Sequence, residues 1–184
     1  MKIEDYIIVA KNVVPLDLCD ALLLEYKNSD EWSQAEVSAG LKLSVRNVKG
    51  IAISEPYVIE KNELSRKKLD SELFLCAAKA IENYASKFTS IKIKEDTGYE
   101  LLQYEKGQFY TQHTDYSKGK NREISCSFAL NDDYEGGEWG FFDRKIVMRI
   151  PKGSVLMFPS NFMYPHEIMP VTKGTRYSVI TWFV

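Results

Sequence analysis

The chain has 184 residues, of which 45% are hydrophobic and 27% are charged. This composition fits a soluble globular protein with a sizeable core, and no repeat, low-complexity segment or linker divides the chain. The formal net charge of −2 excludes a strongly positive field that would draw the whole protein to nucleic acid, and no apolar run has the length of a membrane span. We expect one domain over residues 1–184, with no nucleic-acid or membrane partner.

The cysteines indicate a reducing environment. Cys19, Cys76 and Cys126 lie far apart and are odd in number, so we expect reduced core thiols rather than a disulfide framework. Glu4 and Asp5 interrupt the apolar residues near the N-terminus, which does not fit a secretory signal peptide. These features predict a cytoplasmic location.

The N-terminal part, residues 1–90, is predicted to be mainly helical. YIIV at residues 6–9 predicts a first strand, and Pro15 opens a helix that continues to about Asn28. Residues 61–88 carry the longest helical pattern, because apolar residues recur at steps of three and four while charges mostly occupy the opposite face. This second helix is expected to pack against a sheet.

The segment between the helices, residues 29–57, has a weaker pattern. Alternating apolar residues at 41–45 and at 51–53 indicate one or two strands with a turn at Gly50 between them. Taken alone, the segment is typical of a loop or an edge strand.

From residue 91 onward, short apolar or alternating runs are separated by Gly and Pro turn signals. The runs are IKIK, GYELLQYE, QFYTQHTD, REISCSFALND, GEWGFF, KIVMRI, SVLMFP and RYSVITWFV. About eight short, regularly spaced strands are typical of a sandwich or jelly roll. We therefore predict an α+β fold, in which a double-stranded β-helix (jelly roll) core at residues 91–184 is supported by N-terminal helices on one side.

The chain has two histidines, and each lies in a short polar motif. QFYTQHTD contains His113 and Asp115, which would project from the same face of a strand because side chains alternate. PHEIMPVTKGTR contains His166. Two histidines and one carboxylate with open positions are the ligand set of non-haem Fe(II) oxygenases, although zinc is possible on ligand type. These three residues are the predicted metal ligands.

Open positions on such a metal require a co-substrate that supplies electrons. 2-Oxoglutarate would chelate the metal through one carboxylate and its keto oxygen, and its far carboxylate would need a buried cation at a fixed distance. Arg176, ten positions after His166, offers a guanidinium suited to a carboxylate. It precedes the strand-like run YSVITWF, so we expect it to begin a strand antiparallel to the one near His166.

HTD, the distant PHE and the arginine ten residues later resemble the 2-oxoglutarate- and Fe(II)-dependent dioxygenase family. LLQYEKGQFYTQHTD and LNDDYEGGEWGFF are similar to its prolyl 4-hydroxylase branch in particular. The resemblance covers roughly residues 99–183 and, more weakly, the N-terminal half. It implies an enzyme that uses Fe(II), 2-oxoglutarate and O2, with ascorbate as a further cofactor, to hydroxylate an unactivated C–H bond and release succinate and CO2. The implied substrate is a prolyl residue in a peptide or protein.

The same resemblance implies roles for further residues. Tyr104 matches a tyrosine that contacts 2-oxoglutarate. Three other positions match residues that line the substrate pocket: Tyr110, Arg122 and Trp182. Members of this family often carry a mobile segment over the substrate at the place of residues 29–57. The chemistry needs no general base, and none is assigned.

Three alternatives remain. A hydroxylase of a free amino acid or another small molecule would use the same residues. A nucleic-acid demethylase usually has a second arginine where this chain has Trp182. A non-catalytic, cupin-like binding module commonly presents HxH with a glutamate, whereas the middle ligand here is Asp115.

Overall fold

The computed structural model describes residues 1–37, 40–54, 63–116, 119 and 121–184. Its helices are a 3-10 helix, η1 (Ile3–Tyr6), and two α-helices, α1 (Leu16–Tyr26) and α2 (Glu63–Lys87). The first strands are β1 (Ile8–Ala10), β2 (Ser33–Gln34), β3 (Arg46–Asn47) and β4 (Lys49–Ala52). The later strands are β5 (Glu100–Tyr104), β6 (Phe109–His113), β7 (Ile124–Ala129), β8 (Glu135–Gly136), β9 (Trp139–Phe141), β10 (Ile146–Met148), β11 (Val155–Pro159), β12 (His166–Ile168), β13 (Val171–Lys173) and β14 (Arg176–Phe183).

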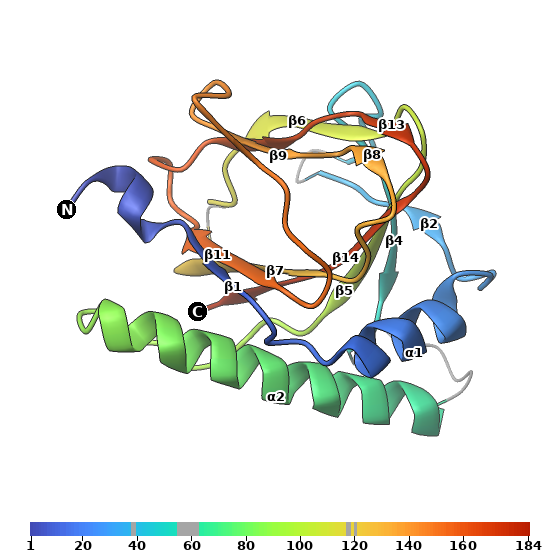
Figure 1. Cartoon of the computed structure of the whole chain (residues 1–184), viewed down its shortest axis with the longest axis horizontal. Coiled ribbons are helices and arrows are strands. Elements are labelled where there is room, and N and C mark those ends of the chain that lie inside the picture. Colours follow the sequence, from blue (N-terminus) through green and yellow to red (C-terminus); the bar gives the residue numbers. More distant parts are fainter. Residues whose placement is uncertain (38–39, 55–62, 117–118, 120) are drawn as a thin grey trace.

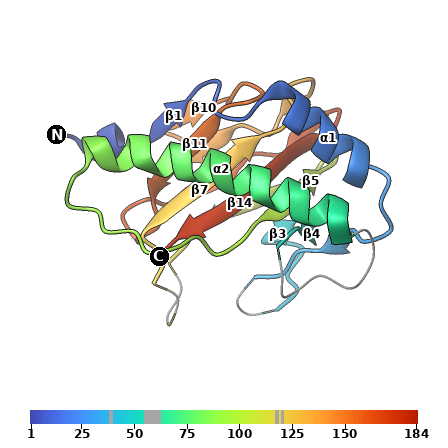
Figure 2. The same ribbon diagram turned by 90° about the horizontal axis from the view of Figure 1, so that it is seen from below.

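The strands form two antiparallel sheets and a small β13–β8 pair. The larger sheet has seven strands in the order β1-β11-β7-β14-β5-β4-β2, and the smaller has five in the order β10-β9-β12-β6-β3. Figure 1 shows the sheets as opposed layers, with α1 and α2 together on the outer side of the larger one. In Figure 2, α2 crosses the strands β11, β7 and β14. This arrangement is a jelly roll with helices on one side, as the sequence predicts.

The central strands are apolar on both faces because the larger sheet is covered on both sides. In β5, Leu101 packs with the helices, whereas Leu102 points into the core between the sheets. In β11, Met157 likewise packs with the helices, and Leu156 points into the core between the sheets. Two hydrophobic layers therefore hold the fold, one under the helices and one inside the jelly roll.

Both predicted helices are confirmed over the described residues. In α1 the buried residues are Leu18, Cys19, Leu22 and Tyr26, as its apolar face indicates. In α2 the buried face includes Leu69, Leu73, Ala77, Ala80 and Tyr84. Residues 61–62 of the predicted second helix lie outside the described residues. All three cysteines are buried and free, as predicted.

The segment at residues 29–57 differs from the sequence prediction. Gly50 lies inside β4, paired with Leu102, and not in a turn. An ideal Cβ at Gly50 would lie 2.5 Å from the Glu100 carboxylate, so the glycine leaves room for that side chain. Leu41 and Leu43 are exposed and precede β3. Residues 38–39 and 55–57 lie outside the described part.

Two further predictions are wrong. IKIK at residues 91–94 forms no strand. Instead, the backbone N–H of Lys94 bonds to the last carbonyl of the chain, at Val184. The strand that begins at Arg176 does not pair with the strand of His166, because β14 lies between β5 and β7 in the larger sheet, whereas β12 belongs to the smaller.

None of the described helices combines the length and hydropathy needed to cross a bilayer.

Candidate metal centre

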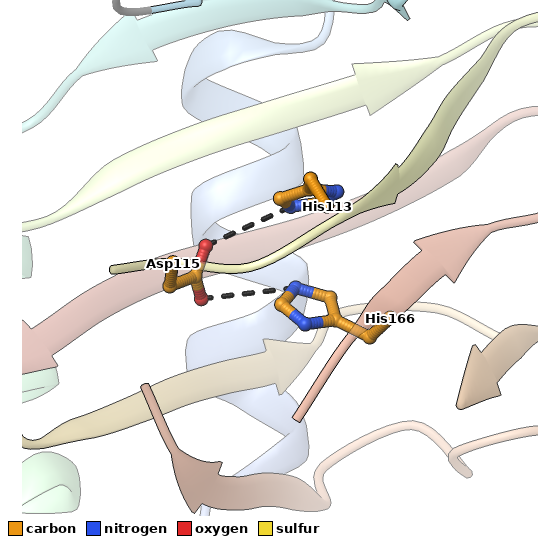
Figure 3. A group of neighbouring side chains, drawn as sticks. All are labelled: His113, Asp115 and His166. Carbon is orange, nitrogen blue, oxygen red and sulfur yellow. Dashed lines mark ion pairs between the residues drawn. The ribbon is translucent and has the colours of Figure 1, made fainter. Parts of the chain in front are cut away.

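His113, Asp115 and His166 converge where β6 ends and β12 begins in the smaller sheet. His113 ends β6 and pairs directly with His166, the first residue of β12, so their rings lie 4.3 Å apart. Asp115 lies two residues beyond the end of β6 rather than within it. Its carboxylate oxygens are 3.6 Å and 3.7 Å from the Nε2 atoms of His113 and His166 (Figure 3). One ligand atom from each residue lies within 4.8 Å of the others.

Backbone contacts fix the tautomer of both histidines. Nδ1 of His113 lies 2.8 Å from the carbonyl oxygen of Thr111, and Nδ1 of His166 lies 3.0 Å from that of Tyr164. A carbonyl can only accept, so each Nδ1 carries a proton, and in the neutral ring each Nε2 presents its lone pair toward Asp115. Burial, reinforced by the neighbouring His166, lowers the pKa of His113 to about 3 and keeps this imidazole neutral. Neutral imidazoles are the form that binds a metal.

Asp115 is held as a carboxylate. Burial alone would raise its pKa, but His166, together with hydrogen bonds from Ser125 and Trp182, lowers the pKa below the usual value. The Ser125 hydroxyl donates to Asp115 Oδ2 at 2.6 Å and lies 2.8 Å from the Ser160 hydroxyl. Two lone-pair nitrogens and one carboxylate suit Fe(II), so the donor set fits the predicted metal.

A cavity of about 910 Å³ opens beside the three residues. Its wall includes four of the five other residues predicted to bind co-substrate or substrate, which are Tyr104, Tyr110, Arg122 and Trp182. This volume lies within the usual range for ligand sites. The structure therefore gathers these residues and the three predicted ligands around one space.

Arg176, the fifth predicted residue, lies at a fully buried part of the same region. It is 4% exposed, and its guanidinium carbon lies 5.0 Å from the ring centre of Tyr104 and 5.6 Å from that of Trp139. Both rings line the cavity. Nη1 donates to the Ser178 hydroxyl at 3.0 Å, and no carboxylate in the described part of the chain forms an ion pair with it. A buried cation without an anion can receive a ligand carboxylate.

The three residues predicted to contact substrate lie close to the metal ligands. Tyr110 stacks on His113 with 3.5 Å between ring centres. Arg122 lies over Trp182, 3.4 Å from its ring centre, and donates to the backbone carbonyl of Asp115 at 3.3 Å. Anything that binds at these side chains would lie next to the metal centre.

Sequence reasoning assigned no role to several residues of the cavity wall, among them Arg46, Glu100 and Trp139. Arg46, in a segment interpreted as a loop or an edge strand, lies over Tyr110 with its Nη2 3.8 Å from Glu100. Trp139 contacts the rings of Phe158 and His166. Strand alternation could have suggested Trp139, since Phe141, two residues away, is also buried. No local signal marks Arg46 or Glu100.

Comparison with known proteins agrees with this geometry. Residues 99–184 match the model of the 2OG-Fe(II) oxygenase superfamily. A PKHD-type hydroxylase of Idiomarina loihiensis is 35% identical over 88 residues, which cover 45% of this chain and 39% of the relative. A PKHD-type hydroxylase of Aliarcobacter butzleri is 26% identical over 168 residues, which cover 84% of this chain and 68% of the relative.

Solved structures show the same fold. A Trichoplax adhaerens prolyl hydroxylase in complex with a hypoxia inducible factor peptide superposes with a TM-score of 0.79 and 19% identity, over 97% of this chain and 83% of the other. A Pseudomonas putida prolyl-4-hydroxylase gives a TM-score of 0.74 and 20% identity, over 97% and 92% of the two chains.

The fold is that of solved prolyl hydroxylases, and the three converging residues form a candidate metal site. Residues 99–184 are similar to the 2OG-Fe(II) oxygenase superfamily. The predicted fold is confirmed, and the match over residues 99–184 together with the three converging residues supports the predicted family, Fe(II) and 2-oxoglutarate. The chain spans about two fifths of the length of the Idiomarina relative.

Proposed function

We propose that the protein is an Fe(II)- and 2-oxoglutarate-dependent dioxygenase that hydroxylates a prolyl residue in a peptide or protein and releases succinate and CO2. One observation carries the proposal: two histidines with Nδ1 tied to backbone carbonyls aim Nε2 at one carboxylate, beside a cavity of about 910 Å³. The family match over residues 99–184 supports the same chemistry.

His113, Asp115 and His166 would hold the metal. When bound, Fe(II) supplies the activation of O2 that oxidises 2-oxoglutarate and the substrate C–H bond. The side chains contribute by fixing geometry in advance: the carbonyls of Thr111 and Tyr164 lock the two rings, and Asp115 is ionised and oriented by a hydroxyl. Such outer contacts keep the ligands in place before the metal arrives.

Arg176 and Tyr104 would hold the far carboxylate of 2-oxoglutarate. Arg176 supplies the charge, and it faces Tyr104 across the β14–β5 pair. Burial raises the pKa of Tyr104 although Arg176 and Arg46 oppose that shift, so the phenol keeps its proton and can donate it in a hydrogen bond. A cation and a neutral donor are suited to a carboxylate.

Tyr110, Arg122 and Trp182 would position the substrate. Their aromatic faces and guanidinium line the cavity next to the metal ligands. The Trichoplax structure described above contains a peptide, which supports a peptide or protein substrate here. Aromatic walls suit the compact, apolar ring of proline.

The cellular setting belongs to the same proposal. Three buried, free thiols support a cytoplasmic location. Ascorbate would act as the reductant that keeps the iron as Fe(II).

The test is turnover with defined components. Protein prepared without O2 is loaded with Fe(II) and 2-oxoglutarate, O2 is admitted, and succinate is measured with a panel of proline-containing peptides and, separately, with free amino acids. We expect succinate in every case and faster production with a peptide that gains one oxygen atom. If only a free amino acid accelerates succinate formation, the substrate is that amino acid and not a peptide. Absence of both stoichiometric iron and succinate would leave a non-catalytic binding module.

A further inference from the structure

Trp139 carries a buried hydrogen-bond donor without an acceptor. The residue is the first of β9 and is 7% exposed. Its indole N–H has no hydrogen-bond partner within the described part of the chain. Buried donors are almost always paired, and an exception often marks the place of a missing water, ion or ligand.

The indole lies close to both the metal centre and Arg176. Its ring centre is 5.6 Å from that of His166 and 5.6 Å from the guanidinium carbon of Arg176. Trp139 also lines the cavity. A molecule that contacts both the metal ligands and Arg176 would therefore lie close to this ring.

The other neighbours of the indole do not explain its unpaired N–H. Phe158 and Phe141 lie 5.8 Å and 6.0 Å away between ring centres, and both are apolar. An indole N–H can only donate, so the natural partner is an acceptor, and beside a cation that acceptor is an anion. The same anion would neutralise Arg176, which has no ion pair among the described residues.

We propose that the Trp139 indole N–H donates a hydrogen bond to the 2-oxoglutarate carboxylate that pairs with Arg176. This inference rests on the proposed function, and it adds a co-substrate contact that neither the sequence motifs nor the family resemblance assigns. Trp139 is then a positioning residue: it fixes the direction of the far carboxylate, while its flat ring forms the wall along the carbon chain. Hydrogen bonds to ionised acceptors are stronger than neutral ones, so the contact favours the dianion.

The test compares two variants and two ligands. Trp139→Phe keeps an aromatic ring and removes the donor. Trp32→Phe is the matched control, because Trp32 donates to the Tyr26 carbonyl at 2.8 Å and does not line the cavity. The dissociation constants of 2-oxoglutarate and of 2-oxopentanoate, which lacks the far carboxylate, are measured by calorimetry on the full chain loaded with Mn(II).

We expect Trp139→Phe to weaken 2-oxoglutarate binding about 10-fold and to leave 2-oxopentanoate unchanged. The Trp32 variant should match the wild type with both ligands. Equal weakening for both ligands, or none for 2-oxoglutarate, would overturn the inference. If the wild type binds no 2-oxoglutarate at all, the proposed function fails as well, so the two failures are distinguishable.

A second measurement needs no change at position 139. The chain has three tryptophans, so Trp32→Phe and Trp182→Phe assign the three indole N–H signals in an NMR spectrum of the Zn(II)-loaded protein. On addition of 2-oxoglutarate, the Trp139 signal should move downfield and exchange more slowly with water. An unmoved signal in a protein that binds 2-oxoglutarate would contradict the contact.

Discussion

Two groups of residues at the cavity differ in how their charges are balanced. The inner group, Tyr104, Trp139 and Arg176, is almost fully buried and contains one cation with no anion. The outer group, Arg46, Glu100, Arg122 and Trp182, is partly exposed. There Glu100 lies beside Arg46, and Arg122 stacks on Trp182.

The two groups give different amounts of information about their ligands. A buried, unpaired guanidinium and an unpaired indole N–H require an anion of limited size, so the inner group indicates its ligand. In the outer group a carboxylate and aromatic faces already stabilise the arginines, so a substrate need not bring a particular charge. The chemistry of the co-substrate therefore follows from the structure more directly than that of the substrate.

The largest expected effect comes from the residue next to both groups. Asp115→Ala should lower iron affinity more than about 100-fold. Losing a residue that only hydrogen-bonds to a metal ligand already lowers metal affinity about 10- to 100-fold, and Asp115 is a ligand itself. Iron content after anaerobic loading and succinate formation would both fall to background. Asp20→Ala, which removes an exposed partner of Lys152, is the control. Retained stoichiometric iron in the Asp115 variant would contradict the assigned ligand set.

Arg176→Gln tests the inner group. Because it removes the only charge there, the KM for 2-oxoglutarate should rise about 100-fold, while iron binding stays unchanged. Arg149→Gln, at an exposed arginine that donates to the Tyr134 carbonyl, should behave like the wild type. A KM that does not change would mean that the far carboxylate lies elsewhere and that the comparison of the two groups fails.

Gly50→Ala tests the outer group without altering any of its members. The added Cβ would lie 2.5 Å from Glu100 Oε1, so the carboxylate has to move relative to Arg46. The partly exposed Arg46–Glu100 ion pair contributes little free energy, so kcat/KM for a peptide substrate should fall about 5-fold at most. Affinity for 2-oxoglutarate should not change, and Glu100→Gln should reproduce the effect. A loss of 2-oxoglutarate binding would show that the groups are not independent.

The smallest effect is expected from Ser178→Ala. The serine hydroxyl accepts from Arg176 Nη1 at 3.0 Å and so helps to orient the guanidinium without touching the cavity wall. Loss of one hydrogen bond should weaken 2-oxoglutarate binding about 3-fold and leave substrate KM unchanged. Calorimetry measures the first and peptide kinetics the second. A change larger than that of Arg176→Gln would mean that Ser178 contacts the ligand itself.

Much of the architecture could be predicted from residue order. Periodicity places the buried faces of α1 and α2, because a helix that covers a sheet must bury one stripe. Alternation and turn residues locate most strands of the C-terminal half. IKIK is the exception: its alternation is that of a strand, but the chain bonds there to its own C-terminal residue.

The sequence by itself determined the chemical candidates. Only two histidines exist, and their motifs with Asp115 and Arg176 indicated iron and 2-oxoglutarate. Tertiary structure alone decided that Arg176 faces Tyr104 and not His166, that Gly50 makes room for Glu100, and that Trp139 lies close to both His166 and Arg176. Periodicity records which face of a strand is buried. Which strand becomes its neighbour depends on contacts between residues far apart in the chain, and these form only when the two sheets close on each other.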